Sequence, residues 1–530
     1  MAQPPILIIG AGVAGLSAAA LLAARGEPVV VLERHGHPGG KLREVTAGGQ
    51  QVDAGPTVFT MRWVFERLFA EAGGDFDSAI KLIPTHILAR HAWDGERQFD
   101  LFADQGESEA AIGDFFGARE AAGYRDFCRE ARNIFEVLRE SFLDATLPTP
   151  LSMMQRIGWA KLPTALAIRP HQPLWRAVSR HFRDPRLRQL FGRYATYCGS
   201  SPFVAPATLM LIAHVEREGV WLVEGGMHAV AKAIERLARA NGAIFRYNAH
   251  VSEILVENGR ACGVRLAGGE EVRARAIVCN GDPAALSIGL FGAAARTATP
   301  PVPAAQRSLS SFTWMLNAAT SGSFPLVRHN VFFSPDYKAE FDAIFRDRKV
   351  PARPTIYICA QDRDDGGGRT GTGPERLQLI VNAPPIGDTH HFSETERATC
   401  ETQTFAFLAA CGLTIERTAP SSVPASTPAA VLVTPTDYEG LFPATGGALY
   451  GRANHGWQAP FQRPGSASRL PGLYLAGGGT HPGAGIPMAS LSGRLAAGQL
   501  LADLPSMPWS QPGDMPGGTS TRSATTAATA

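Results

Sequence analysis

Residues 6–15 read ILIIGAGVAG, an apolar run followed by glycines at the spacing G-x-G-x-x-G. The run predicts a buried parallel strand, and Gly10 permits the tight turn that follows it. Gly12 allows a phosphate to approach the backbone, and Gly15 lets the next helix pack closely on the strand. The N-terminus of that helix faces the phosphates. The motif therefore predicts dinucleotide contacts at Gly10, Gly12, Val13, Ala14 and Gly15.

A second apolar run, PVVVL at 28–32, ends at Glu33. A carboxylate at this position can accept hydrogen bonds from both ribose hydroxyls, and it would repel a 2′-phosphate. Residues 6–24 carry no charge, which also raises the possibility of a transmembrane helix or a signal peptide. The glycines at turn spacing, the missing basic region before them and the strand after them argue against both.

The bulk composition sets the class of protein. The 530 residues exceed one ordinary core, so two domains are expected. Fifty basic and 48 acidic side chains leave a formal charge of +2, which does not favour a nucleic acid partner. The seven cysteines are scattered and never spaced as C-x-x-C, so reduced thiols are favoured over disulfides or a metal site. Residues 504–530 predict a disordered tail, and 362–374 a surface loop.

Further glycine motifs follow Glu33, with HPGGK at 37–41 and DAGPT at 53–57. An NAD-dependent enzyme would complete its nucleotide site within one Rossmann unit, whereas an extended FAD needs backbone contacts over a longer stretch. A simple surface turn is the alternative. This stretch predicts cofactor contacts at Arg34, Gly40, Lys41, Leu42, Gly55, Pro56 and Thr57.

Near its C-terminal end the chain reads PGLYLAGGGTHPGAGIP at 471–487, a strand, a glycine loop and then a helix from about Met488. The strand is expected to rejoin the N-terminal sheet, and the helix N-terminus can stabilise the flavin N1–C2=O edge, which becomes anionic on reduction. A helix from about 228 to Ala240 and a strand over 243–250 lead to Val251, whose backbone can pair with adenine. The further predicted contacts are Val251, Gly477, Gly478, Ile486, Pro487 and Met488.

These motifs resemble those of the FAD-dependent carotenoid desaturases of the bacterial phytoene-desaturase type, within the wider amine-oxidase-like flavoproteins. The resemblance spans most of residues 5–500, and its most specific pieces are GAGVAGLSAA at 10–19, PGGK at 38–41, DAGPT at 53–57, EGGM at 224–227 and YLAGGGTHPGAGIP at 474–487. HNVFFSPDY at 329–337, LIVNAPP at 379–385 and TGGALYG at 445–451 are similar to the branch acting on 1-hydroxylated acyclic carotenoids. Lys41 replaces the arginine of the family's GGR pattern, with Arg43 two residues on, which leaves open whether Lys41 or Arg43 contacts the pyrophosphate.

The resemblance implies an α/β fold in which a Rossmann-like FAD-binding domain of the amine-oxidase and GDI type is interleaved with an α+β substrate domain. We expect 1–75, 220–290 and 465–503 to form the first domain, and 76–219 and 291–464 the second. Residues 308–317, 330–333, 355–360 and 377–382 read as strands of an antiparallel sheet. Aromatic residues at alternating spacing on this sheet either line an apolar tunnel or belong to the core: Phe312, Trp314, Phe332, Phe333 and Tyr357.

The implied activity is C-3,4 desaturation of 1-hydroxycarotenoids such as 1-hydroxyneurosporene, by hydride transfer to flavin. A phytoene or neurosporene desaturase, a flavin-dependent carotenoid isomerase, a prenyl-binding carrier without flavin and an amine oxidase remain alternatives. Quinone or oxygen would accept the electrons. No catalytic base is assigned, because His35, His37 and His481, which lie beside cofactor motifs, more often anchor loops.

An apolar substrate also suggests contact with a membrane. The segment 202–215, PFVAPATLMLIAHV, is too short to span a bilayer, yet it could dip into one face of it or form a buried helix. Basic residues before it could meet anionic headgroups, namely Arg183, Arg186, Arg188 and Arg193. We therefore expect a cytoplasmic protein peripherally associated with the inner or intracytoplasmic membrane.

Overall fold

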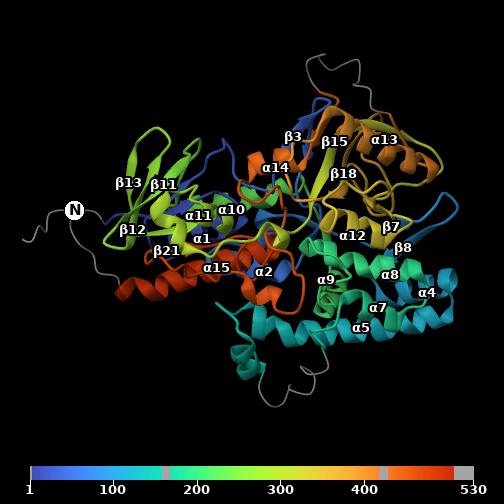
Figure 1. The fold of residues 1–530 in the computed structure, drawn as a ribbon, viewed down its shortest axis with the longest axis horizontal. Coiled ribbons are helices and arrows are strands. Elements are labelled where there is room, and N and C mark those ends of the chain that lie inside the picture. Colours follow the sequence, from blue (N-terminus) through green and yellow to red (C-terminus); the bar gives the residue numbers. More distant parts are fainter. Residues whose placement is uncertain (1–2, 158–167, 417–427, 507–530) are drawn as a thin grey trace, which may run out of the picture.

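The computed structural model describes residues 3–157, 168–416 and 428–506 (Figure 1). The predicted tail lies outside the described residues from 507 onward, and its first three residues, Leu504–Ser506, form a 3-10 turn. A small three-stranded sheet and a parallel sheet occupy one end of the molecule in Figure 1, while a large mixed sheet and a layer of helices occupy the other end.

The first domain is built on a five-stranded parallel sheet with the order β10-β2-β1-β14-β21. The apolar runs predicted from the sequence form β1 (Ile6–Ile9) and β2 (Val29–Leu32), and the late strand is β21 (Leu473–Leu475). β21 pairs in parallel with β14 (Ala276–Cys279), which confirms that the C-terminal strand rejoins the N-terminal sheet. The strand expected over 243–250 is shorter, since β10 covers only Ile244–Arg246.

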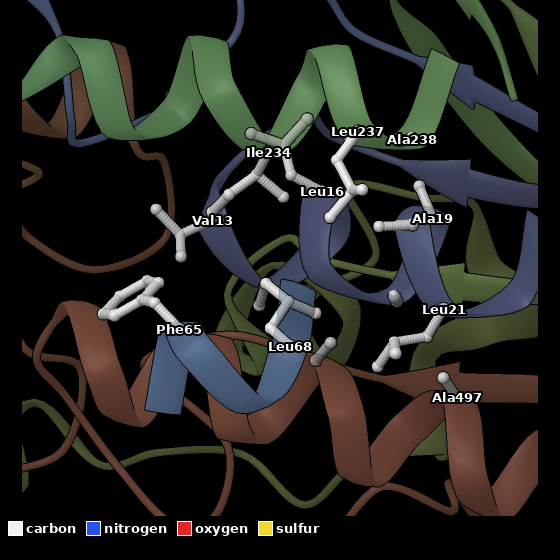
Figure 2. Close-up of a cluster of buried hydrophobic side chains, with 14 of the residues drawn as sticks. Val13, Leu16, Ala19, Leu21, Phe65, Leu68, Ile234, Leu237, Ala238 and Ala497 are labelled. Carbon is white, nitrogen blue, oxygen red and sulfur yellow. The ribbon is translucent and has the colours of Figure 1, made fainter. Parts of the chain in front are cut away.

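Two helices contact one face of this sheet, α1 (Val13–Ala24) and α15 (Ile486–Asp503), and two more pack on them, α2 (Arg62–Glu71) and α10 (His228–Ala240). α1 is uncharged and almost wholly buried, because α10 packs on one side of it and α2 and α15 on the other (Figure 2). Leu16 and Ile234 meet in this core, as do Leu21 and Ala497 on the α15 side. The uncharged run after the first glycine motif is therefore a central helix of a globular domain.

The small sheet lies against the other face and consists of β11 (Val251–Glu257), β12 (Arg260–Leu266) and β13 (Glu271–Arg273). Its apolar side shares one core with β1 and β14, through Ile254, Val264 and Ile277. Both faces of the parallel sheet are thus covered, as its continuous apolar strands require.

The second domain contains an eight-stranded sheet with the order β19-β15-β18-β17-β16-β7-β8, in which β20 also pairs with β15. Its strands are β7 (Ile87–Ala92), β8 (Gln98–Phe102), β15 (Ser310–Ser321), β16 (His329–Phe332), β17 (Ile356–Ala360), β18 (Glu375–Ala383), β19 (Thr414–Glu416) and β20 (Ala430–Val433). The four predicted strands are present, and their pairings are antiparallel except that between β16 and β7. Residues 362–374 form an exposed or half-exposed loop, as predicted.

A helical layer packs against the end of this sheet that carries β7 and β8 (Figure 1). It comprises α4 (Gln105–Phe116), α5 (Ala118–Leu138), the π-turn η1 (Arg139–Leu143), α7 (Leu174–His181), α8 (Pro185–Gly192), η2 (Arg193–Cys198), η3 (Ala207–Met210) and α9 (Leu211–Glu218). Asp184 caps α8 by accepting a hydrogen bond from the Arg186 amide, and Pro185 occupies the first turn. These two local signals fix the residue at which α8 begins.

The aromatic residues considered for a tunnel have different environments. Phe312, Trp314 and Phe332 are at most 1% exposed and pack in one core with Phe392 and with Leu408 of α13 (Glu394–Ala410). Phe333 belongs to the core beneath the helical layer. Tyr357 lines a small pocket, whereas the burial of the other four in these two cores favours the core interpretation for them.

The segment 202–215 is mostly interior, because η3 and the start of α9 are buried beneath α5 and α7. Within it only Val204 is exposed, at 46%. Arg193 is partly covered by Tyr197, and Arg186 is held by Asp184, which leaves Arg183 as the one exposed residue of the four arginines. The expectation that this segment dips into a membrane is therefore wrong. In the described part of the chain, no helix is both long and apolar enough to cross a bilayer.

The strands of the parallel sheet come from the three ranges assigned to the first domain, and those of the large sheet from the ranges of the second. A hairpin of the first domain also contacts the large sheet. β3 (Glu44–Ala47) and β4 (Gln50–Asp53) pack against β15 and β18 of the large sheet. The domain boundaries themselves stay a prediction.

Candidate functional site

The carboxylate of Glu33 is fixed where β1 and β2 end. Its Oε2 accepts a hydrogen bond from the Ala11 amide at 2.7 Å, and its Oε1 accepts one from the His35 amide at 2.9 Å. The residue is 6% exposed. Because each carboxylate oxygen can accept two hydrogen bonds, a second acceptor position remains on each. These two acceptor positions are what two donating ribose hydroxyls require.

The adenine end of the predicted site lies beside Glu33. The Ala249 amide donates to the Glu33 carbonyl at 2.8 Å, and the Asn248 amide donates to the His35 carbonyl at 3.1 Å. Val251, two residues further on, opens β11 and is buried. The fold therefore brings Glu33 and Val251 together, although they are far apart in the chain.

The glycine turn follows β1 at the point where the strand order reverses, between β1 and β14. Open α/β sheets bind ligands at this point. A β-carbon on Gly12 would lie 2.7 Å from Nδ2 of Asn280, and one on Gly15 would lie 2.2 Å from the Gly10 carbonyl oxygen. Both glycines are therefore required by close contacts within the turn. The first turn of α1, with Val13 and Ala14, has no capping side chain and no acidic residue, so its amides are available to an anion.

Asn280 contacts the predicted site, and sequence reasoning missed it. It follows β14, and its Nδ2 donates to the Gly10 carbonyl at 3.3 Å. On its other side its Oδ1 would lie 3.1 Å from a β-carbon on Gly477. The sequence signal for Asn280 was its position directly after a buried strand, in AIVCN at 276–280. Only the pairing of β14 with β1 places it where the strand order reverses.

The second glycine motif lies directly over the first. The Gly39 amide donates to the Ala11 carbonyl at 2.8 Å, and a β-carbon on Gly40 would lie 3.2 Å from Cα of Gly12. Gly40 has φ +60°, a conformation that favours glycine. Leu42 is buried, and its amide closes the turn on the Gly39 carbonyl at 3.0 Å. The two glycine turns together form one continuous backbone cradle.

The basic side chains after this cradle turn toward one segment, residues 438–449. Lys41 donates to the Leu449 carbonyl and lies 5.2 Å from the Phe442 ring centre, and burial lowers its pKa. Arg34 donates to the Leu441 carbonyl. Arg43 has one buried Nη2 without a partner in the described residues. Arg43 therefore has one buried nitrogen that can still donate, whereas the single nitrogen of Lys41 already donates to Leu449.

Residues 53–57 connect the cradle to the large sheet. Gln361 clamps Asp53 from both sides, accepting from its amide at 3.0 Å and donating to its carbonyl at 2.9 Å. The Asp53 carboxylate in turn accepts from the Met227 amide at 2.8 Å, at the start of α10. Sequence reasoning missed both Asp53 and Gln361 as positioning residues.

The rest of this motif contacts β17 and β18. Gln378 donates to the Gly55 carbonyl at 3.0 Å, and a β-carbon on Gly55 would lie 2.0 Å from the Lys41 carbonyl oxygen. Pro56 follows, and the Thr57 hydroxyl lies 2.6 Å from the Tyr357 hydroxyl. This short segment is therefore held by the cradle on one side and by the substrate-domain sheet on the other.

The C-terminal loop closes the site. Arg463 donates to the Gly478 carbonyl at 2.8 Å, and the Gly477 amide donates to the Ser492 hydroxyl at 3.1 Å. α15 then begins at Ile486, two residues before the expected start, with Pro487 and Met488 in its first turn. That turn has no capping side chain and no acidic residue. It presents free amides in the same way as α1.

The three histidines beside the cofactor motifs have structural partners. His481 Nε2 donates to the Phe142 carbonyl at 3.0 Å, and burial lowers its pKa to about 4. His37 Nδ1 donates to the Pro38 carbonyl at 3.2 Å, and the His35 ring accepts from Arg34 at 3.2 Å. These contacts agree with loop-anchoring roles.

The seven cysteines are all free thiols in the structure, five of them buried.

The model of the family described as flavin containing amine oxidoreductase matches residues 13–501, which is most of the chain. The chain belongs to this family. The match confirms an oxidoreductase with a flavin cofactor, and the cradle, the ribose-facing carboxylate and the two uncapped helix N-termini fit that cofactor.

Relatives within this family differ in their similarity to the chain. A protein of Rubrivivax gelatinosus named hydroxyneurosporene desaturase is 54% identical over 531 residues, covering 99% of both chains. A zeta-carotene-forming phytoene desaturase of Myxococcus xanthus is 30% identical over 514 residues, covering 94% of this chain and 93% of that one. A solved putrescine oxidase variant aligns with a TM-score of 0.55 at 15% identity, over 94% of this chain and 99% of the other. This last likeness confirms the predicted amine-oxidase fold class.

Proposed function

We propose that this protein is an FAD-dependent desaturase that introduces the C3–C4 double bond into 1-hydroxylated acyclic carotenoids such as 1-hydroxyneurosporene. The observation that carries the proposal is the 54% identity, over 99% of both chains, to a hydroxyneurosporene desaturase. Identity to a phytoene desaturase is 30%, which makes action on phytoene or neurosporene the second candidate.

The cofactor contacts we propose fall into three groups along an extended FAD. Glu33 and Val251 bind the adenosine end, and the two glycine turns with the first turn of α1 bind the pyrophosphate. Residues 55–57 and the start of α15 bind toward the ring end. The complete set is Gly10, Gly12, Val13, Ala14, Gly15, Glu33, Arg34, Gly40, Lys41, Leu42, Gly55, Pro56, Thr57, Val251, Gly477, Gly478, Ile486, Pro487 and Met488, to which the structure leads us to add Asn280.

FAD, when bound, supplies a two-electron acceptor for the hydride removed from an allylic carbon. The chain itself has to hold the carotenoid against it and exclude water. The half-buried Tyr357 and the buried His329 next to Thr57 serve this purpose, because burial lowers the pKa of His329 to about 3 and so keeps its ring uncharged beside an apolar substrate. The proton released from the neighbouring carbon is acidic once a delocalised cation has formed, so we assign no side chain as a strong base.

The deciding experiment incubates the purified protein with FAD, liposomes and 1-hydroxyneurosporene, with phytoene and neurosporene in parallel. Loss of two hydrogens by mass and a red shift in absorbance, from the hydroxylated substrate alone, is the expected result. Turnover of phytoene or neurosporene instead assigns the protein to the earlier desaturases. A product of unchanged mass identifies an isomerase, oxidation of a simple amine identifies an amine oxidase, and refusal of FAD identifies a carrier.

We also propose that the protein meets the membrane through a surface around 147–156. Leu147, Leu151 and Met154 are 55%, 69% and 55% exposed, and Arg156 is exposed beside them. Exposed apolar side chains with a basic neighbour are typical of an interfacial segment. This surface replaces the buried segment 202–215 in the proposal, with the protein on the cytoplasmic side of the inner or intracytoplasmic membrane.

Leu151→Ser combined with Met154→Ser should lower the fraction of protein that sediments with anionic liposomes. Ile288→Ser changes a residue that is 54% exposed on α11 (Pro283–Ile288), and it should leave this fraction unchanged. Equal sedimentation of both variants would refute this surface.

Anaerobic assays with and without an added quinone distinguish quinone from oxygen as the electron acceptor.

A further inference from the structure

A small pocket lies between the large sheet and the helical layer, next to the segment proposed to contact FAD. Its apolar wall includes Val58, Leu88 and Leu190. Its polar wall includes His91 from β7, Arg193 from η2 and His329 from β16. A mostly apolar pocket with a few converging polar groups is typical of a site that orients one functional group of an apolar ligand.

Each of these three polar side chains has an atom without a partner. His91 Nε2, Arg193 Nε and His329 Nε2 are buried, and none has a hydrogen-bond partner in the described residues. The His91 and His329 side chains belong to residues that are 0% and 2% exposed. Buried polar atoms are nearly always hydrogen-bonded, so three unpaired atoms around one pocket point to a polar ligand.

The donor and acceptor roles of two of these atoms follow from their other contacts. His91 Nδ1 faces the Phe99 carbonyl at 3.2 Å, and a carbonyl can only accept, so Nδ1 carries the hydrogen. Nε2 of the neutral ring is then an acceptor. Burial lowers the pKa of His91 to about 3, with Arg193 adding to this effect, which keeps the ring neutral. Arg193 Nε can only donate.

Arg193 is held in place by three further polar side chains that also line the pocket, Tyr194, Tyr197 and Glu216. Its Nη2 donates to the Tyr197 hydroxyl at 3.4 Å, and Tyr197 in turn donates to Glu216 at 2.6 Å. Tyr194 donates to the other oxygen of Glu216 at 2.7 Å. The cluster balances the guanidinium charge and leaves Nε directed to no protein group in the described residues.

The pocket is also close to the reacting end of the proposed substrate site. Val58 follows Thr57 in the chain, and the hydroxyls of Thr57 and Tyr357 are 2.6 Å apart. Tyr357 lies 2.8 Å from Nδ1 of His329. A chain of hydrogen bonds therefore runs from the proposed cofactor segment to the polar wall of the pocket.

The chemistry of the substrate requires a polar partner at this place. In a 1-hydroxycarotenoid the hydroxyl and two methyl groups are on C1, and three carbon–carbon bonds separate C1 from the allylic C4. The hydroxyl oxygen thus lies within about 5 Å of the carbon that reacts. A hydroxyl donates one hydrogen bond and accepts others, and its two methyl groups suit an apolar wall.

We propose that the pocket of His91, Arg193 and His329 binds the C1 hydroxyl of the substrate, with Arg193 Nε donating to its oxygen and His91 Nε2 accepting its hydrogen. This inference rests on the proposed function and adds the residues that distinguish hydroxylated from non-hydroxylated carotenoids.

The test compares wild type with His91→Asn and His329→Asn. Asparagine can keep a donor near the position of Nδ1, but it lacks the atom at Nε2. The dissociation constants of 1-hydroxyneurosporene and neurosporene are measured from carotenoid absorbance in detergent micelles, alongside turnover of both. His91→Asn should weaken binding of the hydroxylated carotenoid about tenfold and leave neurosporene unchanged.

His214→Asn is the matched control, because His214 is also buried and has an unpartnered Nδ1, yet it does not line this pocket. It should leave the preference for the hydroxylated carotenoid intact. The inference is overturned, while the proposed function stands, if both pocket variants keep the preference for the hydroxylated carotenoid. The same holds if they lose affinity equally for both carotenoids. Wild-type protein without any preference overturns the proposed function and the inference with it.

Discussion

Gly493 of α15 crosses α1 at Ala14, where a β-carbon on the glycine would lie 2.1 Å from the Ala14 carbonyl oxygen. The Ser17 and Ser490 hydroxyls, 3.0 Å apart, join the same two helices nearby. This crossing places the uncapped N-termini of α1 and α15 in one site, although the helices begin at Val13 and Ile486. The relative position of these two helix N-termini therefore depends on the small size of Gly493.

Gly493→Ala should separate the helices and destabilise the protein by about 1–3 kcal/mol, with weaker FAD binding, because the backbone cannot yield without moving α15. Gly498→Ala in the same helix is the control, since nothing lies within 4 Å of its β-carbon and the residue is exposed. It should be neutral or stabilise the protein by up to roughly 1 kcal/mol. Denaturant unfolding and FAD titration measure both, and equal effects would contradict this role of Gly493.

Glu33→Gln should lower FAD affinity by about 10- to 100-fold. The carboxylate accepts from two backbone amides, and a glutamine can accept from only one of them while its NH₂ group opposes the other. FAD titration followed by flavin fluorescence measures the loss. Glu270→Gln, which alters a 54% exposed side chain paired with Arg246, should bind FAD like wild type.

Asn280→Asp should weaken FAD binding more than Asn280→Ala does. Both variants lose the donor to the Gly10 carbonyl, but aspartate also adds a negative charge at the proposed pyrophosphate position. We expect a loss of about tenfold for alanine and about a hundredfold for aspartate. Equal affinities in the two variants, measured at low and high salt, would argue against a phosphate at this place.

The stability of the protein should fall as pH rises toward neutrality because of Glu340, on α12 (Tyr337–Phe345). Burial raises the pKa of this carboxyl from 4.5 to about 7, although the Thr355 hydroxyl, at 2.6 Å, favours the charged form. Its pKa is higher in the folded state, so its stabilising contribution is complete below about pH 4.5 and is lost as pH rises through about 7.

Glu340→Gln removes this titration. The free energy of unfolding of wild type should therefore decrease, relative to that of the variant, by roughly 2–3 kcal/mol between about pH 5 and pH 8. Denaturant unfolding across this range measures the difference. Parallel pH profiles would show that Glu340 is ionised in the folded protein.

Much of the first domain was predictable because its signals are local. A strand such as ILII at 6–9 and the turn glycines after it depend on neighbours within a few residues, and the same holds for the start of α15 near Met488. The segment 202–215 was harder. Its apolar composition suits a buried helix and a membrane-facing one equally, and only its position beneath α5 and α7 decides between them.

The identity of the cofactor class and of the strands that bind it could thus be inferred from the order of residues, because a phosphate-binding turn needs particular residue types at fixed spacing. Asn280, Gln361 and the pocket around His91 and His329 could not. Their roles depend on contacts between residues more than two hundred positions apart, such as Asn280 with Gly10, and on which polar atoms remain unpaired after packing. Spacing along the chain carries no information on either, so the folded arrangement alone determines them.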